Sequence, residues 1–438
     1  MRFVITSGGT AGHIYPAVAV AHELLRRGHD VYFAGTPAGQ ESVIVPKEGI
    51  KYKAFKASGF DRAKPGKLPG AVLTVVRSMF KARKWLREIS PAAVAGFGGY
   101  VSIPVGAAAH IGNDIPLLIH EQNSAPGLAN RYLARSAAAI ALTYDAAREK
   151  LIKYKDTSND APTDASNGAS GDARDDSTGL SGVGPCVRVT GNPVRASIID
   201  SASGQARLDA GLAFRANYDI PETAPVLLVF GGSQGARHIN DAICDFAPRL
   251  LAASTMHIVH ITGPKEYGRV QERARELARD DAACDNVDAN AAAGAGCDVN
   301  AESQPILSAD KALRWHLIDY CDDMPGAYAA ASLAVCRSGA STLAEIAVMG
   351  LPAVLVPYPH ATDDHQTANA QSLVSVNAAH MFADQDIDDI SFADDISALM
   401  ADTDALAKMA NAALALNARG ATNAVVELLL DIANKSGK

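Results

Sequence analysis

The chain has 438 residues, of which 48% are hydrophobic and 20% charged, and its formal net charge at pH 7 is −8. This length is too great for one ordinary hydrophobic core and predicts two domains, and the composition is that of a soluble globular enzyme. Six cysteines without a Cys-x-x-Cys pair exclude a disulfide framework and a zinc site and favour a reducing cytosol, and we expect neither a signal peptide nor a transmembrane segment.

The first half of the chain alternates predicted strands and helices. Strands are predicted at residues 3–5, 31–34, 93–95 and 117–119, and helices at residues 17–27, ending at Gly28, and at residues 70–89. Short apolar strands that alternate with helices predict a doubly wound parallel sheet.

A glycine-rich loop, Gly-Gly-Thr-Ala-Gly at residues 8–12, follows the first predicted strand and precedes a helix. Such a loop is an anion cradle, because its backbone N–H groups point outward and a phosphate can approach glycine closely. His13 comes directly after it. There its imidazole would serve either as a general base or, less specifically, as a local hydrogen-bond partner at the start of the helix.

The segment from Lys51 to Arg87 contains eleven Lys or Arg and one acid, Asp61, which is a local net charge of +10. Its helical part interleaves apolar side chains with cations, a pattern that suits shallow docking on an anionic lipid surface. The alternatives are a core-packed face with solvated lysines outside and a nucleic-acid surface, for which no recognisable module is present. The membrane patch that we predict consists of Leu73, Val76, Arg77, Phe80, Lys81, Lys84 and Trp85.

Four polar residues, His-Glu-Gln-Asn at 120–123, follow the predicted strand at 117–119. Mixed donors and acceptors at the end of a strand suit the hydroxyl groups of a sugar. A metal site is disfavoured, because no third ligand stands at a characteristic spacing.

Residues 155–183 are polar with almost nothing to bury, and we predict a disordered surface insertion there. Order resumes at a strand, residues 187–189, and residues 191–195 are a plausible hinge. A second polar, Ala- and Asp-rich stretch lies at residues 280–303.

The second half of the chain repeats the alternation of predicted strands and helices of the first half. Strands are predicted at residues 226–230, 257–261, 333–335 and 353–356, and a final helix at residues 422–433 has an apolar face wide enough to dock on another domain. A second glycine loop, residues 231–235, has the spacing of the first and follows an apolar strand in the same way. Two such loops predict two stacked α/β domains that face phosphorylated ligands.

A third loop, residues 337–345, again follows a strand and opens a helix in which Glu345 lies about a turn and a half from the start. A carboxylate there can bind both ribose hydroxyls, or it can be an ordinary acid near the helix N-terminus, stabilised by the dipole. Together with the polar residues 357–369, Glu345 outlines the wall of a nucleotide-sugar pocket.

The ordered set of motifs resembles the MurG family, the N-acetylglucosaminyltransferases that make lipid II of bacterial peptidoglycan, over nearly the whole chain. The motifs that carry the resemblance are Gly8-Gly9-Thr10-Ala11-Gly12-His13, Gly98-Gly99-Tyr100, His120-Glu121-Gln122-Asn123, Gly191-Asn192-Pro193-Val194-Arg195, Gly231-Gly232-Ser233-Gln234-Gly235-Ala236-Arg237 and Arg337-Ser338-Gly339 through Glu345. Where related sequences commonly carry two glutamines, this chain has His365-Gln366.

The resemblance implies an α/β fold of two Rossmann-like doubly wound domains around a cleft, the GT-B glycosyltransferase fold. It implies an acceptor-binding, membrane-facing domain at residues 1–190, with the insertion at 156–182, and a UDP-sugar donor-binding domain at residues 191–420, with the insertion at 280–303. The helix at residues 421–438 is expected to pack back on the N-terminal domain.

The resemblance also implies the site residues. For the donor UDP-N-acetylglucosamine these are Thr10, Ala11, Gly12, His13, Asn123, Arg195, Ser233, Gln234, Cys321, Ala340, Ser341, Thr342, Glu345, His365, Gln366 and Asn369. On the acceptor side they are Gly9, Tyr100, His120, Gln122 and Asn130.

The implied reaction is attack by the 4-hydroxyl of the N-acetylmuramyl unit of the undecaprenyl-pyrophosphate-linked muropeptide on the anomeric carbon of the donor, with inversion. His13 is the expected base and Glu121 the alternative, and no metal or cofactor is required because amides, a helix dipole and Arg195 would hold the departing UDP. The expected location is the cytoplasmic face of the cell membrane, as a peripheral protein with cell-wall synthesis and division proteins as partners and no nucleic acid. The rivals are a UDP-N-acetylglucosamine 2-epimerase, which shares the scaffold but needs no membrane acceptor, a non-catalytic nucleotide-binding scaffold, and an NAD dehydrogenase, for which neither loop has the Gly-x-Gly-x-x-Gly spacing.

Overall fold

The computed structural model describes residues 1–57, 68–111, 113–156, 185–232, 236–288, 309–416 and 418–437. The chain divides into two compact units, which we call unit 1 (Met1–Gly191 with Asn423–Lys438) and unit 2 (Asn192–Thr422). The predicted insertion at 156–182 lies outside the described residues except for its first residue, which ends a helix.

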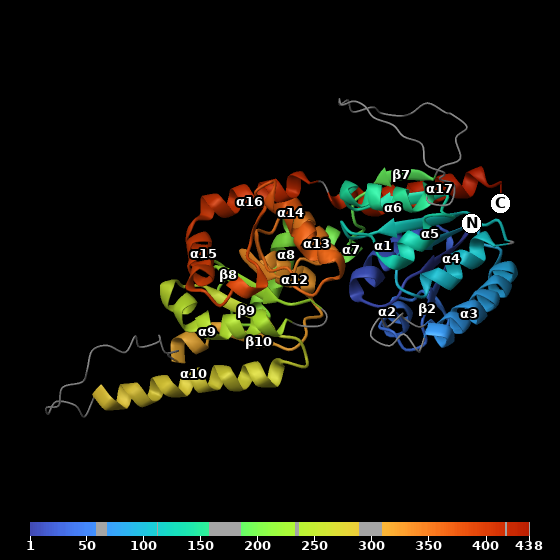
Figure 1. Ribbon diagram of the computed structural model, residues 1–438. Coiled ribbons are helices and arrows are strands. Elements are labelled where there is room, and N and C mark those ends of the chain that lie inside the picture. The colour runs from blue at the N-terminus through green and yellow to red at the C-terminus, as the bar shows by residue number, and fades with distance from the viewer. Residues whose placement is uncertain are drawn as a thin grey trace, which may run out of the picture. The chain divides into compact units, whose positions relative to one another are not determined.

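Unit 1 is built on a seven-stranded sheet in the order β3-β2-β1-β4-β5-β6-β7, and every pairing in it is parallel. The strands are β1 (Arg2–Thr6), β2 (Asp30–Gly35), β3 (Lys51–Ala54), β4 (Ala93–Gly96), β5 (Leu117–Glu121), β6 (Ala139–Leu142) and β7 (Cys186–Val189). The helices are α1 (Ala11–Arg26), α2 (Glu41–Lys47), α3 (Leu68–Ile89), α4 (Ser102–His110), α5 (Leu128–Leu133), α6 (Arg148–Asp156) and, from the far end of the chain, α17 (Ala421–Lys435) (Figure 1).

Alternation along β1 distributes its side chains to both faces of this sheet. Phe3 and Ile5 pack in one buried cluster with residues of α1 and α17, and Val4 packs in another with residues of α3 and α4. Both faces are therefore covered by helices, which explains why the central strands β4, β5 and β6 are buried along their whole length. The C-terminal helix α17 supplies Val425, Leu428 and Leu429 to the core of unit 1.

Unit 2 is built on a six-stranded sheet in the order β10-β9-β8-β11-β12-β13, again with parallel pairings only. The strands are β8 (Val226–Phe230), β9 (His257–Ile261), β10 (Trp315–Ile318), β11 (Leu333–Cys336), β12 (Ala353–Leu355) and β13 (Ala379–Met381). The helices are α7 (Ala196–Asp200), α8 (Gly204–Asn217), α9 (Arg237–Ala253), α10 (Tyr267–Asp288), α11 (Ala309–Ala312), α12 (Met324–Ala330), α13 (Ala340–Met349), α14 (His365–Val374), α15 (Ile390–Ala401) and α16 (Thr403–Ala415). Short 3-10 turns lie at Asp145–Ala147, Thr362–Asp364, Asp384–Asp386 and Ala418–Gly420.

The α/β fold class with two doubly wound parallel sheets, predicted from the alternation, is confirmed. Helix α1 begins at Ala11 rather than at the predicted residue 17, and it contains Pro16. Proline has no N–H group, so the bond to the carbonyl oxygen of Gly12 is absent in the second turn of this helix. Helix α10 continues to Asp288, so the first part of the polar stretch predicted at 280–303 is helical.

Candidate functional site

Each sheet has a point where the strand order reverses, and ligands of doubly wound proteins bind at the carboxyl ends of the strands there. In unit 1 this point lies between β1 and β4, and the loops that follow these strands are residues 7–10 and the Gly98-Gly99 turn. In unit 2 it lies between β8 and β11, and the loops begin at Gly231 and Arg337. The motifs singled out from the sequence thus fall on the ligand-binding edge of each sheet.

The two loops of unit 1 touch, and only glycine permits their approach. A Cβ on Gly99 would lie 2.1 Å from the carbonyl oxygen of Gly8, and a Cβ on Gly98 would lie 3.3 Å from Nδ1 of His13. Both glycines have positive φ, +87° at Gly98 and +80° at Gly99, a backbone conformation that other residues rarely adopt. The turn therefore makes the room in which the His13 ring sits.

His13 lies in the first turn of α1 and is half-buried. Its Nδ1 is 2.8 Å from Oε1 of Gln122, which follows β5 and is buried. His120, also buried, lies 3.1 Å from Nε2 of Gln122 through its Nδ1, and its Nε2 is 3.0 Å from the carbonyl oxygen of Gly191. Burial lowers the pKa of His120 to about 4, so this ring is neutral at physiological pH.

Glu121, the alternative base, has both carboxylate oxygens occupied. Oε1 accepts from the backbone N–H of Asn123 at 3.0 Å, and Oε2 accepts from the N–H of Gly127 at 3.0 Å and from Nδ2 of Asn130 at 2.8 Å. Its exposed fraction is 1%. This carboxylate holds the loop between β5 and α5 in shape, and the geometry favours His13 over Glu121 as the base.

The remaining predicted residues of unit 1 surround His13 or lie at its loop. Gly9 and Thr10 are exposed in the turn before α1, Ala11 and Gly12 begin the helix, and Tyr100 is 41% exposed after the Gly98-Gly99 turn. Asn130 is buried and also donates to the carbonyl oxygen of His120. Asn123 is half-buried beside Glu121.

In unit 2, the carboxylate of Glu345 accepts hydrogen bonds from two other side chains. Arg195 donates to its Oε1 through Nε at 3.2 Å and Nη2 at 2.9 Å, and the Tyr328 hydroxyl donates to its Oε2 at 2.9 Å. Tyr328 is fully buried, and burial followed by the nearby Glu345 charge raises its pKa well above 10, so the phenol keeps its proton. Tyr328 was not predicted from the sequence. The signal that could have pointed to it is a single tyrosine in a short helix whose other residues are mostly small.

The polar loop after β12 is tied to the start of α13. The Ser338 hydroxyl donates to the carbonyl oxygen of Gln366 at 2.8 Å, and Oε1 of Gln366 accepts from the N–H of Tyr358 at 2.9 Å. Nδ2 of Asn369 lies 3.4 Å from the carbonyl oxygen of Ser338. The structure brings these predicted sugar-binding residues together, with His365 in the same loop, where its Nδ1 is 2.8 Å from the carbonyl oxygen of Thr362.

The other predicted donor residues lie on different elements of unit 2. Ala340, Ser341 and Thr342 form the first turn of α13, and Cys321 is buried just after β10. Ser233 and Gln234 lie outside the described residues.

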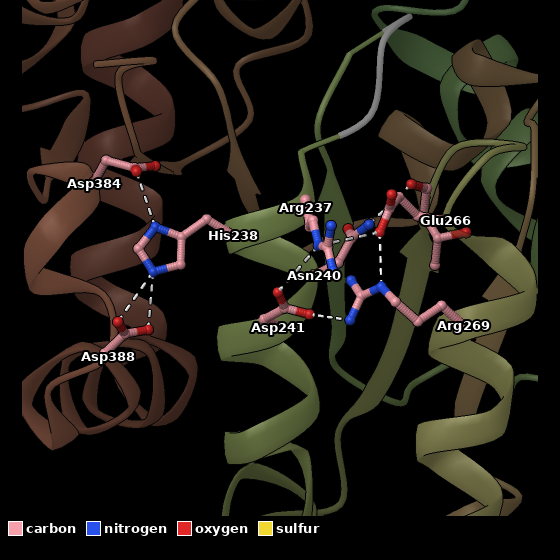
Figure 2. A network of polar contacts seen from close by, with 9 residues as sticks. Arg237, His238, Asn240, Asp241, Glu266, Arg269, Asp384 and Asp388 are labelled. Atoms are coloured by element: carbon pink, nitrogen blue, oxygen red, sulfur yellow. Dashed lines mark hydrogen bonds and ion pairs between the residues drawn. The ribbon is translucent and has the colours of Figure 1, made fainter. Parts of the chain in front are cut away.

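Helix α9, which follows the second glycine loop, carries a charged network (Figure 2). His238 lies between two carboxylates, with Nδ1 2.9 Å from Asp384 and Nε2 3.0 Å from Asp388. Asp384 also pairs with Arg337, whose Nη1 donates to the carbonyl oxygens of Val356 and Pro357, at 3.1 Å each. The network thus links the start of α9 to the ends of β11 and β12.

On another side of α9, Arg269 donates to Glu266 at 2.8 Å and pairs with Asp241. Arg237 lies 4.0 Å from both acids. These ions are partly exposed and close to one another (Figure 2), so they contribute little individually to stability.

Helix α3 exposes most of the predicted membrane patch. Exposed fractions are 50% for Leu73, 38% for Val76 and 58% for Phe80, and Arg77, Lys81 and Lys84 are also exposed. The prediction was wrong for Trp85, which is not part of the exposed patch because its ring is buried with Phe55 in the core of unit 1. Within the described part of the chain, no helix has the length and apolar character needed to span a membrane.

Comparison with known proteins covers both units. The glycosyltransferase family 28 N-terminal domain matches residues 3–142, and the glycosyltransferase family 28 C-terminal domain matches residues 226–427. The UDP-N-acetylglucosamine--N-acetylmuramyl-(pentapeptide) pyrophosphoryl-undecaprenol N-acetylglucosamine transferase of Halothermothrix orenii is 33% identical over 436 residues, covering 100% of both chains. The protein of the same name from Desulforudis audaxviator is 32% identical over 437 residues, covering 99% of each. Among solved structures, MurG of Acinetobacter baumannii is 25% identical with a TM-score of 0.62 and covers 98% of this chain and 99% of its own.

Proposed function

Because the chain belongs to glycosyltransferase family 28, we propose that it transfers N-acetylglucosamine from UDP-N-acetylglucosamine to the 4-hydroxyl of the N-acetylmuramyl unit of an undecaprenyl-pyrophosphate-linked muropeptide, with inversion. The predicted resemblance to the MurG family and the predicted class of enzyme, a glycosyltransferase, are confirmed by the full-length relatives. The proposal rests on the side chains at the carboxyl ends of the strands, which differ between the two sheets. Unit 1 has His13 and its hydrogen-bond partners there, and unit 2 has Glu345 with Arg195.

Unit 2 is the proposed donor site. Glu345 would bind the ribose hydroxyls, the backbone around Cys321 would face the uracil, and Thr342 would lie near the phosphates. His365, Gln366 and Asn369 would contact the sugar. The glycine loop, together with the start of α9 and Arg195, would stabilise the charge on departing UDP.

Unit 1 is the proposed acceptor site, with the loop before α1 facing the acceptor diphosphate. His13 would remove the proton of the attacking hydroxyl as the general base. The assignment is supported by its position in the first turn of α1, directly after the loop at the switch point, and by the full occupation of the Glu121 carboxylate.

The decisive experiment incubates the full chain with labelled UDP-N-acetylglucosamine and a lipid I analogue. The expected product is the lipid-linked disaccharide together with UDP. Formation of UDP and N-acetylmannosamine without acceptor would instead indicate the epimerase, and nucleotide binding without turnover would indicate the scaffold.

The exposed side of α3 is the proposed contact with the anionic cytoplasmic membrane surface, where the protein would meet its lipid-linked acceptor. Three apolar side chains and three cations share this side, and each Lys or Arg near an anionic surface contributes about 1 kcal/mol. Insertion of the apolar side chains would add to that attraction.

Vesicle flotation tests this contact. The triple change Arg77→Glu, Lys81→Glu and Lys84→Glu should weaken binding to anionic vesicles, while Lys265→Glu, Arg273→Glu and Arg275→Glu, three exposed cations of unit 2, provide the matched control. Equal binding by the wild type and the α3 variant would exclude the proposed membrane contact.

A further inference from the structure

His13, Gln122 and His120 form a chain of hydrogen bonds. Which group donates and which accepts in each bond follows from the backbone carbonyl oxygens near Gln122, which can only accept. Nε2 of Gln122 lies within hydrogen-bond distance of two backbone carbonyl oxygens, Phe97 at 3.1 Å and His120 at 3.2 Å. A carbonyl oxygen only accepts, so the atom that faces both must be the amide nitrogen. The opposite orientation would place the amide oxygen of Gln122 against two acceptors inside a buried site.

The orientation of Gln122 fixes the proton on each neighbouring ring. Oε1 of Gln122 can only accept, so Nδ1 of His13, at 2.8 Å, must carry a hydrogen. At the other end, Nδ1 of His120 accepts from Nε2 of Gln122 at 3.1 Å, so the hydrogen of neutral His120 lies on Nε2 and is donated to the carbonyl oxygen of Gly191 at 3.0 Å. The two hydrogens of Nε2 of Gln122 serve three acceptors, so one hydrogen is shared between two of them, and each group in the chain keeps one donor or acceptor role.

We infer that Gln122 is a positioning residue that holds His13 in the tautomer with the proton on Nδ1 and the basic lone pair on Nε2. The inference rests on the proposed function, in which His13 is the base. It replaces the expectation that Gln122 and His120 contact the acceptor, because both side chains are buried, with exposed fractions of 1% and 0%.

The surroundings make this arrangement rigid. Phe97 stacks on the His120 ring, with ring centroids 5.3 Å apart and planes inclined by 25°, and the main chain at Gly98 closes over the His13 ring. The partner of His13 is a neutral amide, which orients the ring through Nδ1 without adding a charge to the site.

The test compares Gln122→Met, which keeps the volume and removes the amide, with Gln122→Glu, in which a carboxyl oxygen can still accept from Nδ1 of His13. The full-length protein is labelled with ¹⁵N-histidine, and the His13 signals are assigned by their loss in a His13→Asn variant. The wild type and Gln122→Glu should show the Nδ1–H tautomer at His13, and Gln122→Met should show a mixture.

The kinetic expectation is that Gln122→Met lowers kcat about tenfold or more with little change in the KM for UDP-N-acetylglucosamine, while Gln122→Glu retains more of the activity. An Nε2–H tautomer at His13 in the wild type would overturn the inference. So would a properly folded Gln122→Met protein, judged by its melting temperature, with wild-type kcat. If the wild type forms no disaccharide at all, the proposed function fails, and the tautomer measurement still decides the role of Gln122.

Discussion

Each unit contains a strand followed by a glycine loop and a helix, β1 and α1 in unit 1 and β8 and α9 in unit 2. The two segments share this order of elements but differ in the partners of the histidine in the first turn of the helix. In unit 1, His13 in α1 meets the neutral amide of Gln122 at 2.8 Å. In unit 2, His238 in α9 lies between the carboxylates of Asp384 and Asp388, at 2.9 and 3.0 Å. One histidine is oriented by an uncharged partner, and the other is held in an ion-pair network.

The comparison shows how the same strand, glycine loop and helix can serve two purposes. Hydrogen bonds to two acids favour the charged imidazolium of His238, which then ties α9 to the turn at Asp384–Asp386 and is poorly suited to proton transfer. The amide of Gln122 contacts His13 at Nδ1, and the proposed proton transfer uses the other ring nitrogen, Nε2. The repeat in the sequence is therefore a repeat of the anion-binding backbone, and the chemistry depends on the side chains that follow it.

The largest expected effect is on the first histidine. His13→Ala should lower kcat by roughly 100-fold or more, the usual contribution of a positioned acid–base group, when turnover is measured with saturating acceptor. The matched change in the second element, His238→Ala, should lower kcat much less than His13→Ala does, since its ring is directed at Asp384 and Asp388 (Figure 2).

Turnover of His13→Ala near the wild-type level would remove His13 from the role of base. Equal losses in the two variants would show that the two elements are functionally alike and would break the comparison.

Much of the fold could be predicted from apolar runs, and most of the missed strands lie at the edges of the sheets. The strand predicted at residues 226–230 is β8 and that at 257–261 is β9, because both are central, buried and continuously apolar. The buried strand β6 was missed although it is apolar, and so were the edge strands β10, β3 and β13: β3 carries exposed lysines, and β13 has three residues of which one is buried. Strands of this kind are defined by the neighbour they pair with and not by their own pattern.

The same limit applies to the site. The sequence placed His13, Glu121 and Glu345 at the ends of strands or the starts of helices, because those positions follow from local pattern. It did not predict that His13 contacts Gln122, 109 residues away, or that Glu345 contacts Tyr328, 17 residues away. Such contacts join segments that follow different strands, and the strand order that brings them together is not encoded in local spacing.

An intermediate effect is expected in the donor site of unit 2. Tyr328→Phe removes the hydroxyl that donates to Glu345 at 2.9 Å, a bond to a charged group whose loss should weaken UDP binding about tenfold. If Glu345 binds the ribose, the preference for UDP over 2′-deoxy-UDP should also fall, because the carboxylate is no longer held in place. Calorimetric titration of both nucleotides into the wild type and the variant measures this.

Tyr218→Phe is the control, since Tyr218 packs against Phe214 in the same unit. An undiminished preference in Tyr328→Phe would contradict a positioning role for Tyr328. A wild type that binds the two nucleotides equally would contradict ribose recognition itself.

The smallest effect is a pH-dependent contribution to stability from His238. Burial alone would lower the pKa of this ring, but the hydrogen bonds to Asp384 and Asp388 outweigh it and raise the pKa above its usual 6.5. A group with a raised folded-state pKa adds stability that is complete below the unfolded pKa and is lost as the pH rises through the folded value. His238→Asn should therefore destabilise the protein by roughly 1 kcal/mol or less at pH 6, and the difference in melting temperature should shrink toward pH 9. Asp388→Asn removes one of the two acids and should show a smaller difference in melting temperature from the wild type, with the same trend with pH. If the difference for His238→Asn did not depend on pH, His238 would contribute by packing and not by charge.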